Sequence, residues 1–208
     1  MTVTVTPVAP ATAPVKAVVL AAPEAVTPYP KPYNNETYKP THPGRFRVVF
    51  DQSAGAGESF SSKLVAERDY APGETLALLD NKSAAPVKAY SSVQYGAGPN
   101  DHLELNSDLL FMNHSCAPTV EMVLPSRQPE RWEVRVGPAG VKKGGDLTFF
   151  YPSTEWDMAQ GFTCSCGAKT HTSQNCLGEI NGAKYLTLEQ LEERGLVNDH
   201  IRALKAGQ

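Results

Sequence analysis

Short runs of alternating apolar and polar residues predict a chain that is mostly β. Trp132, Val134 and Val136 alternate with Glu133 and Arg135, which is the pattern of a half-buried strand. Further strands are predicted wherever β-branched, leucine and aromatic residues cluster: Arg45–Asp51, Lys63–Glu67, Thr75–Leu79, Val120–Leu124 and Leu147–Tyr151. The stretch Asn81–Pro99 bears glycines and keeps no hydrophobic period, so it is expected to be irregular.

Helical signals gather at the C-terminal end. The sequence Thr187-Leu188-Glu189-Gln190 has the capping-box pattern, and Gly195 is a plausible stop. A second short helix is expected from about Asn198 to Lys205. The pattern as a whole therefore predicts a mostly-β domain of short strands with a helical tail at 187–208.

The first 44 residues differ from the rest in composition. They are rich in Ala, Val, Thr and Pro, and their prolines disfavour regular hydrogen bonding. We expect an extended or disordered arm. Tyr29, Tyr33 and Tyr38 are able to dock on the domain, although the composition favours a solvated linker.

Composition and charge exclude several classes of function. The formal net charge of −3 is spread over interspersed acidic and basic residues, so direct nucleic-acid binding is not expected. No apolar run reaches the about 18 residues that a membrane span needs, and the N-terminus lacks the basic region of a secretory signal. We expect an intracellular protein, in the cytoplasm or the nucleus, whose four cysteines are metal ligands or reduced thiols.

The spacing of the cysteines predicts a structural zinc site. Cys164 and Cys166 are separated by one residue, Cys176 follows after a glycine-containing loop, and Cys116 lies about fifty residues earlier. The surrounding sequence is polar and offers little core, which disfavours the alternative of buried, reduced cysteines. A second alternative is that His171 replaces one thiolate.

Two further positions are candidates for chemistry. Asn113-His114 lies next to Cys116, and Tyr151 stands at the end of the last core strand with its hydroxyl at a strand terminus. Each also has a structural interpretation: a satisfied turn for Asn113-His114, and a tyrosine hydrogen-bonded to backbone for Tyr151. The sequence alone leaves both interpretations open.

Four segments in this order resemble the SET domain, the fold of S-adenosylmethionine-dependent protein lysine methyltransferases. The similar segments are Ala66–Leu76, Asn113-His114-Ser115-Cys116, Gly144–Tyr151, and Phe162–Gly167 with Cys176-Leu177-Gly178. The resemblance implies a β-clip fold with a knot-like C-terminal strand over 45–157, and a post-SET zinc element over 158–186. In the family, the cysteine of the central motif completes that zinc site.

The resemblance also implies roles for individual residues. Asn113 and His114 would hold S-adenosylmethionine, and Phe162 and Leu177 would help to cover its adenine. Tyr151 would line the channel in which a lysine amine meets the methyl group, and Tyr90 and Tyr95 are both open as a second channel tyrosine. The implied function is methyl transfer to a lysine amine of a protein.

The chain departs from the family pattern at several positions. Ser61-Ser62-Lys63 aligns with the cofactor-binding Gly-x-Gly segment, Phe150 stands where aspartate is usual, and Leu110 stands where arginine is frequent. These departures favour an alternative, in which a SET-like protein has lost methyl transfer. Such a protein would bind a peptide or handle a small-molecule substrate in the modified cleft.

Overall fold

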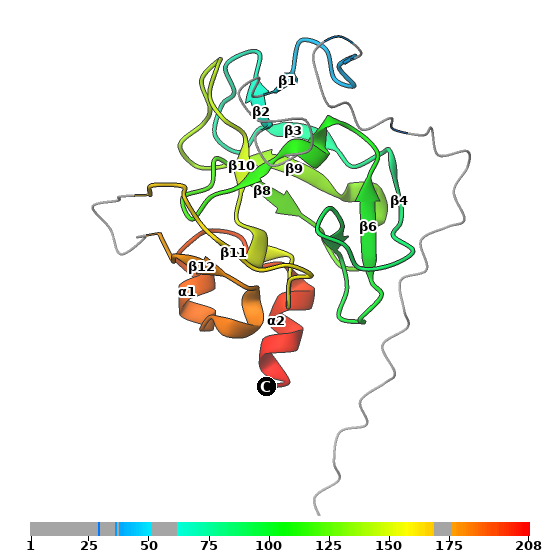
Figure 1. Cartoon of the computed structure of the whole chain (residues 1–208), viewed down its shortest axis with the longest axis vertical. Coiled ribbons are helices and arrows are strands. Elements are labelled where there is room, and N and C mark those ends of the chain that lie inside the picture. Colours follow the sequence, from blue (N-terminus) through cyan, green and yellow to red (C-terminus); the bar gives the residue numbers. More distant parts are fainter. Residues whose placement is uncertain (1–28, 30–35, 37, 51–61, 169–175) are drawn as a thin grey trace, which may run out of the picture.

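The computed structural model describes residues 29, 36, 38–50, 62–168 and 176–208. Its largest antiparallel sheet has the order β3 (Thr75–Leu78), β9 (Glu133–Val136) and β8 (Val120–Val123). As predicted from the alternation in β9, Val134 and Val136 are buried while Glu133 and Arg135 are half exposed. A second such sheet, β4 (Lys82–Ala84), β6 (His102–Leu105) and β5 (Val93–Gln94), lies beside it (Figure 1). The fold is mostly β with short helices, as the pattern predicts.

The prediction of irregular structure over Asn81–Pro99 is wrong at two places, since β4 and β5 lie within it. Both strands pair with β6, which supplies the buried side chains Leu103 and Leu105. Strands of two or three residues are too short to show a period of two. Their pairing with β6 is therefore visible only in the folded chain.

Strands β1 (Phe46–Val49) and β2 (Lys63–Ala66) form an antiparallel pair at the top of Figure 1. A glycine turn packs on the segment that follows β2, where Tyr70 and Val141 exchange backbone hydrogen bonds of 2.8 and 3.1 Å. Gly140 has φ +67° in this turn, and a Cβ there would meet the Tyr70 carbonyl oxygen at 2.8 Å. The turn therefore needs glycine for both its conformation and its contact.

Two short pairs complete the β structure. Strand β7 (Asn113–His114) runs parallel to β10 (Thr148–Phe149), and β11 (Phe162–Thr163) is antiparallel to β12 (Glu179–Ile180). The predicted strand 147–151 is longer than β10, because Pro152 lies in a 3₁₀ turn, η4 (Tyr151–Ser153), that begins at Tyr151. The other 3₁₀ turns within the described ranges are η2 (Asp108–Phe111), η3 (Pro129–Arg131) and η5 (Ala183–Tyr185).

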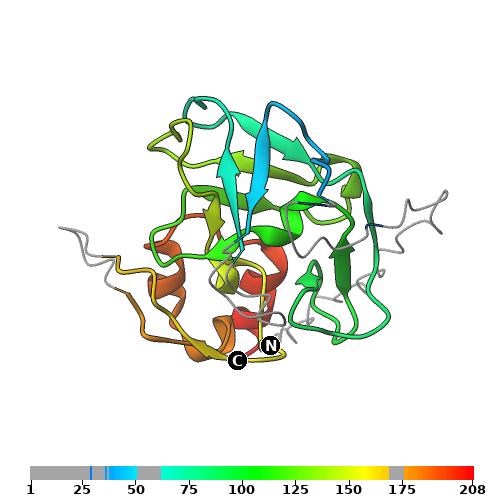
Figure 2. The same cartoon turned by 45° about the horizontal axis from the view of Figure 1, so that its top comes forward.

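The C-terminal helices α1 (Leu188–Glu192) and α2 (Asp199–Ala206) lie together on one side of the sheets (Figures 1 and 2). The predicted capping box is confirmed: Gln190 N donates to Thr187 Oγ1 at 3.1 Å, and Thr187 N donates to Gln190 Oε1 at 2.8 Å. The helices enclose a second, smaller core formed by Phe150, Ala183, Leu191, Val197 and Ile201.

Asn198 joins the helical tail to the rest of the domain. Its side chain is buried; Oδ1 accepts from Leu124 N at 2.8 Å, and Nδ2 donates to the carbonyls of Met122 (2.9 Å) and Ser153 (3.0 Å). The residue occupies the N-cap position of α2, yet its side chain makes no capping hydrogen bond. It therefore fixes both the end of β8 and the 3₁₀ turn that starts at Tyr151.

Two tyrosines from the N-terminal arm are docked on the domain. The carboxylate of Asp108, which is fully buried, accepts hydrogen bonds from Tyr29 Oη and Tyr38 Oη, both at 2.7 Å, and from Thr41 N at 3.0 Å. At these two positions the structure differs from the solvated linker that the composition favoured. A buried carboxylate needs donors, and the tyrosine hydroxyls supply them. Tyr33 lies outside the described residues.

Replacement of Asn198 by alanine is expected to lower the free energy of unfolding by about 2–4 kcal/mol, because Leu124 N and the Met122 carbonyl would lose a buried side-chain partner and the Ser153 carbonyl would keep only its bond from the backbone of residue 198. Chemical denaturation measures the change. The control is Asp199→Asn, at the exposed next residue, where the change should stay within about 0.5 kcal/mol. Equal effects of the two substitutions would contradict the role of Asn198.

Candidate functional site

The four cysteines lie together, with all four sulfur atoms within 4.8 Å of one another. Cys116 is buried in the domain, and its Sγ is 4.0 Å from that of Cys164. Sulfurs in a tetrahedron around one ion, at metal–sulfur distances of about 2.3 Å, would be roughly 3.8 Å apart. The cluster therefore has the size and the donor set to hold one metal ion. The alternative ligand His171 lies outside the described residues.

Hydrogen-bond donors surround the sulfurs of the cluster. Leu177 N donates to Cys116 Sγ and Cys166 N donates to Cys164 Sγ, both at 3.4 Å. Burial alone would raise the pKa of the Cys166 thiol, but donors including the Cys116 and Ala168 N–H groups lower it to about 6. At Cys166 the donors thus favour thiolate, which is the form that binds metal. Burial has the larger effect at Cys116 and Cys164, where it holds the pKa of each thiol above its ordinary value.

His114 connects this cluster to Tyr151. Tyr151 N donates to His114 Nδ1 at 3.2 Å, so the neutral ring carries its proton on Nε2, which faces Cys116 Sγ at 3.4 Å. Burial and, secondarily, Arg194 lower the pKa of His114 to about 4, which keeps the ring neutral. One imidazole thus contacts a cysteine of the cluster on one side and the backbone of Tyr151 on the other.

Aromatic rings surround His114 on three sides. Its ring centroid is 5.2 Å from that of Tyr151, 5.5 Å from Phe162 and 5.6 Å from Phe150. Phe162 comes from β11, which follows Tyr151 in the chain, so the C-terminal segment folds back over the central motif. The structure thereby brings His114, Tyr151 and Phe162, three of the residues singled out in the sequence, into one cluster.

The remaining predicted site residues are distributed around this cluster. Asn113 Nδ2 donates to the Ser62 carbonyl at 2.9 Å, which joins β7 to the segment aligned with the family's glycine motif. Lys63 follows, but its ammonium is exposed and paired with Asp146 at 2.8 Å. Leu177 is half-buried against the second core. Ser61 lies outside the described residues.

Tyr151 lines a small cavity of about 50 Å³ together with apolar side chains of Leu105, Leu109, Leu110, Met112 and Phe149. Its hydroxyl donates to the Met112 carbonyl at 3.0 Å. Burial, followed by the charge of Glu155, holds the pKa of Tyr151 above its ordinary value. The phenol is therefore protonated at neutral pH. Its proton is used in the bond to the Met112 carbonyl, so the lone pairs of its oxygen take no part in that bond.

Glu155, which the sequence analysis missed, lines the same cavity. The residue is 8 % exposed, and its Oε1 accepts from Gln94 N at 2.7 Å and from Thr154 Oγ1 at 3.4 Å. Burial raises the pKa of Glu155 to about 7, although these two donors and Lys88 act in the opposite direction. In the sequence it follows Ser153-Thr154 and belongs to no motif, so no pattern distinguishes it from a surface carboxylate.

The structure also separates the two tyrosines that were open as a second channel residue. Tyr90 lines the cavity with Tyr151, whereas Tyr95 packs against Trp132 with ring centroids 5.2 Å apart. Tyr90 is therefore the one positioned to meet a ligand of that cavity.

Two methyltransferases are similar to this chain in sequence. The methyltransferase flvH of Aspergillus flavus is 40% identical over 173 residues, which cover 82% of this chain and 86% of flvH. The chain belongs to the flvH family of methyltransferases. The histone-lysine N-methyltransferase ASHH3 of Arabidopsis thaliana is 23% identical over 83% of this chain, which spans 53% of ASHH3. No family model matches the chain.

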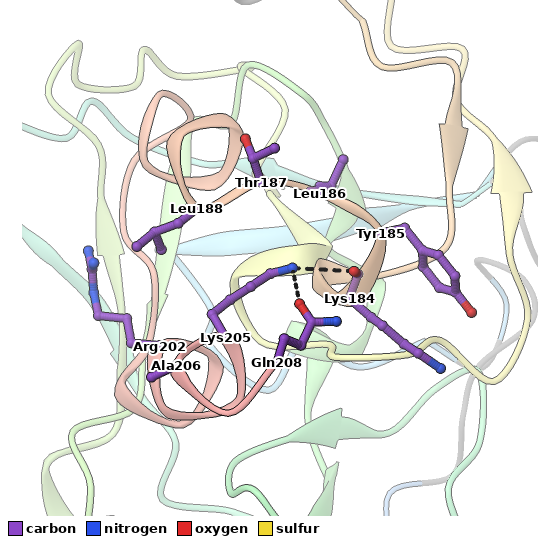
Figure 3. A pocket seen from close by; sticks show the side chains of 9 residues that line it. All are labelled: Lys184, Tyr185, Leu186, Thr187, Leu188, Arg202, Lys205, Ala206 and Gln208. Atoms are coloured by element: carbon purple, nitrogen blue, oxygen red, sulfur yellow. Dashed lines mark hydrogen bonds between the residues drawn. The ribbon is translucent and has the colours of Figure 1, made fainter.

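A larger, open hollow of about 570 Å³ lies between α2 and the segment 184–188 (Figure 3). Its cations are already engaged: Lys205 donates to Gln208 Oε1 at 2.8 Å, Lys184 pairs with Asp157 at 3.1 Å, and Arg202 pairs with Glu192. None of the predicted site residues lines it.

In the described part of the chain, no helix has both the length and the apolarity to cross a membrane.

The raised pKa of Glu155 predicts a specific dependence of stability on pH. A carboxyl whose pKa is raised by folding stabilises the fold most in acid, and this contribution is lost as pH rises towards 7. Between about pH 5.5 and pH 8, the wild type should lose about 2 kcal/mol relative to Glu155→Gln, which does not titrate.

Urea denaturation at the two pH values, with the metal kept saturating, measures the difference. Glu104→Gln on β6 makes the same change outside the cavity and should follow the wild type. Parallel pH profiles for the wild type and Glu155→Gln would contradict the raised pKa.

Proposed function

We propose that the chain is an S-adenosylmethionine-dependent methyltransferase of the SET class, and that it transfers a methyl group to a lysine amine of a protein. The observation that carries the proposal is the adjacency of Asn113-His114, the ring of Phe162 and the cavity of Tyr151. The names of flvH and ASHH3 support methyl transfer, and that of ASHH3 supports a lysine substrate.

The topology around β7 supports the SET fold. Asn113 pairs with Thr148 and His114 with Phe149 in parallel, although more than thirty residues separate the strands in sequence. Strand β10, the last strand of the SET-like region, thus runs directly beside the central motif, as a knot-like core requires. The segment with β11 and β12 then folds over the same motif, as a post-SET element would.

The metal that we propose for the cysteine cluster is zinc in a structural role. Four thiolates are the usual donor set of closed, tetrahedral zinc sites. Cys116 belongs to the central motif and the other three belong to the C-terminal segment, so the ion would hold Phe162 against His114 and the backbone of Leu177 against Cys116. The bond from His114 Nε2 to Cys116 Sγ would orient that ligand.

The residues expected to hold the cofactor fit a surface site. Asn113, His114, Phe162 and Leu177 are half-buried, and they come from three separate parts of the chain that contacts join together. When bound, S-adenosylmethionine would supply an electrophilic sulfonium methyl group. The chain would supply positioning, a stacking surface and exclusion of water.

Two departures from the family pattern have structural explanations that leave methyl transfer intact. Phe150 is 3 % exposed and forms the second core with Leu191 and Ile201, so it anchors the helical tail. Leu110 contributes to the apolar wall of the cavity. Neither Phe150 nor Leu110 therefore implies that the chain has lost methyl transfer.

Tyr151 is suited to a positioning role. Because its hydroxyl donates to the Met112 carbonyl, its oxygen presents lone pairs that are able to accept weak C–H···O contacts from a polarised methyl group. Because its pKa is raised, it does not act as a base at neutral pH.

The purified chain is expected to contain one zinc ion, measured by elemental analysis. Cys166→Ser should weaken zinc binding by at least about tenfold, because it removes one of four thiolates. Ser165→Ala, at the exposed residue between two ligands, is the control and should keep the metal. Full zinc content in Cys166→Ser would contradict the site.

The zinc-loaded chain is expected to bind S-adenosylmethionine in calorimetry and to transfer labelled methyl groups to lysine peptides. Tyr151→Phe should lower kcat by about 10–100-fold with little change in cofactor affinity, because it removes a group that positions the reacting centre. Tyr185→Phe, at an exposed tyrosine, is the control.

A panel of free small-molecule amines, run beside the peptides, separates the two sources of substrate. Absence of both cofactor binding and label transfer would overturn the proposal and favour a SET-like scaffold without methyl transfer.

A further inference from the structure

The cavity beside Tyr151 has a mixed lining in which apolar residues predominate. Leucine, methionine, phenylalanine, valine and alanine form the larger part of it, and the polar lining residues include Tyr90, Ser92, Tyr151 and Glu155. Its volume of about 50 Å³ suits the end of a narrow chain rather than a whole ligand. A ligand that matches such a site has a slim alkyl chain and ends in a group complementary to a carboxylate.

The carboxylate of Glu155 has one oxygen in use and one available. Oε1 accepts from Gln94 N and Thr154 Oγ1, whereas Oε2 has no hydrogen bond to any residue that the structure describes. A carboxylate accepts hydrogen bonds at both oxygens. The residue is thus held in place through one oxygen, with the other left for a ligand.

No ion pair of Glu155 is found within the described ranges of the chain. Lys88, whose charge acts on Glu155, precedes β5, and its ammonium donates to the Asp157 carbonyl. His200, from α2, hydrogen-bonds the Thr154 carbonyl at 2.8 Å rather than Glu155, and Tyr151 is neutral. A cation paired with Glu155 is therefore not supplied by the described residues, and a ligand is able to provide it.

We propose that Glu155 binds the amine end of the substrate and accepts its proton before methyl transfer. This inference rests on the proposed function for its reaction step. An alkylammonium that enters the cavity donates a hydrogen bond to Glu155 Oε2 and then passes that proton to it. The products are a neutral amine and a neutral carboxylic acid.

The neutral amine then has the lone pair that the reaction needs. Its nitrogen attacks the methyl carbon, a C–N bond forms, and the electron pair of the broken C–S bond remains on sulfur. The positive charge moves from the sulfonium to the methylated nitrogen, and the proton on Glu155 is returned to solvent when the product leaves. Charge and atoms balance without another reactant.

The assignment divides two tasks between neighbouring residues. Tyr151 stays protonated and orients the reacting centre, whereas Glu155 titrates close to neutral pH and is suited to exchange a proton there. The cavity with Tyr151 and Glu155 is suited to a primary amine on an unbranched alkyl group. That group is either a lysine side chain or part of a free small-molecule amine.

The first test uses n-butylammonium as a probe, with 1-butanol as its uncharged counterpart, on the zinc-loaded full chain. The wild type should bind n-butylammonium more tightly than 1-butanol in calorimetry. Glu155→Gln keeps the acceptor for Gln94 N but loses the charge, and should weaken n-butylammonium at least tenfold while leaving 1-butanol unchanged. Glu104→Gln is the matched control, and thermal unfolding shows that each variant is folded.

The second test is the pH profile of kcat/KM with a substrate identified from the amine and peptide panels. The acid limb of the wild-type profile should be lost in Glu155→Gln, and Glu155→Asp should restore it in part. A residue with a purely structural role would lower activity evenly across pH and would leave the preference for the charged probe intact.

The outcomes separate this inference from the proposed function. Intact cofactor binding, together with equal n-butylammonium affinity and equal pH profiles in the wild type and Glu155→Gln, would overturn the inference alone. A wild type with no preference for n-butylammonium over 1-butanol would also overturn it. Loss of n-butylammonium binding in Glu155→Gln, in a chain that binds no cofactor, would keep Glu155 as an amine site and overturn the proposed function.

Discussion

The parallel pairing of β7 with β10 is the contact on which the site depends. Each strand has only two residues, and two parallel strands of this length have little stability of their own. Additional bonds hold the pair: Ser115 N donates to the Phe149 carbonyl at 3.1 Å, and Thr119 N donates to that of Thr148 at 3.0 Å. The pairing fixes the position of His114 relative to Tyr151, and the imidazole–backbone bond between them follows from it.

Two separate sets of contacts hold the chain after β10 in place. One is the cysteine cluster, which brings Cys164, Cys166 and Cys176 to Cys116. The other is the second core around Phe150, reinforced by Asn198 with its bonds to the Met122 and Ser153 carbonyls. The short segment between these two contacts contains Tyr151 and Glu155, so both residues are constrained by the cysteine cluster on one side and by the C-terminal helices on the other.

The parts of this structure that were predictable from sequence are those in which the physical signal is local or chemically rare. The alternation in β9 and the capping box at Thr187 each lie within a few residues, and both are confirmed. Four cysteines in 208 residues have few partners other than one another, so their grouping was also foreseeable.

The features that could not be predicted from the sequence depend on contacts between residues that are far apart in the chain and belong to no motif. Strand β5 exists because β6 lies beside it, and Tyr29 docks because Asp108 is buried 79 residues later in the chain. Glu155 becomes a cavity residue through Gln94, which lies on β5 and donates a backbone hydrogen bond to it. No periodicity, spacing or composition reports contacts of this kind, since each requires the folded neighbours to be known.

Glu155 also changes the meaning of the phenylalanine at position 150. From the motif alone, Phe150 removes a carboxylate from the neighbourhood of Tyr151. In the folded chain a carboxylate is still present there, provided by the turn that starts at Tyr151 rather than by the strand before it. Position 150 is thereby free to serve the second core, and a substitution that suggests lost chemistry in the sequence is compatible with retained chemistry in the fold.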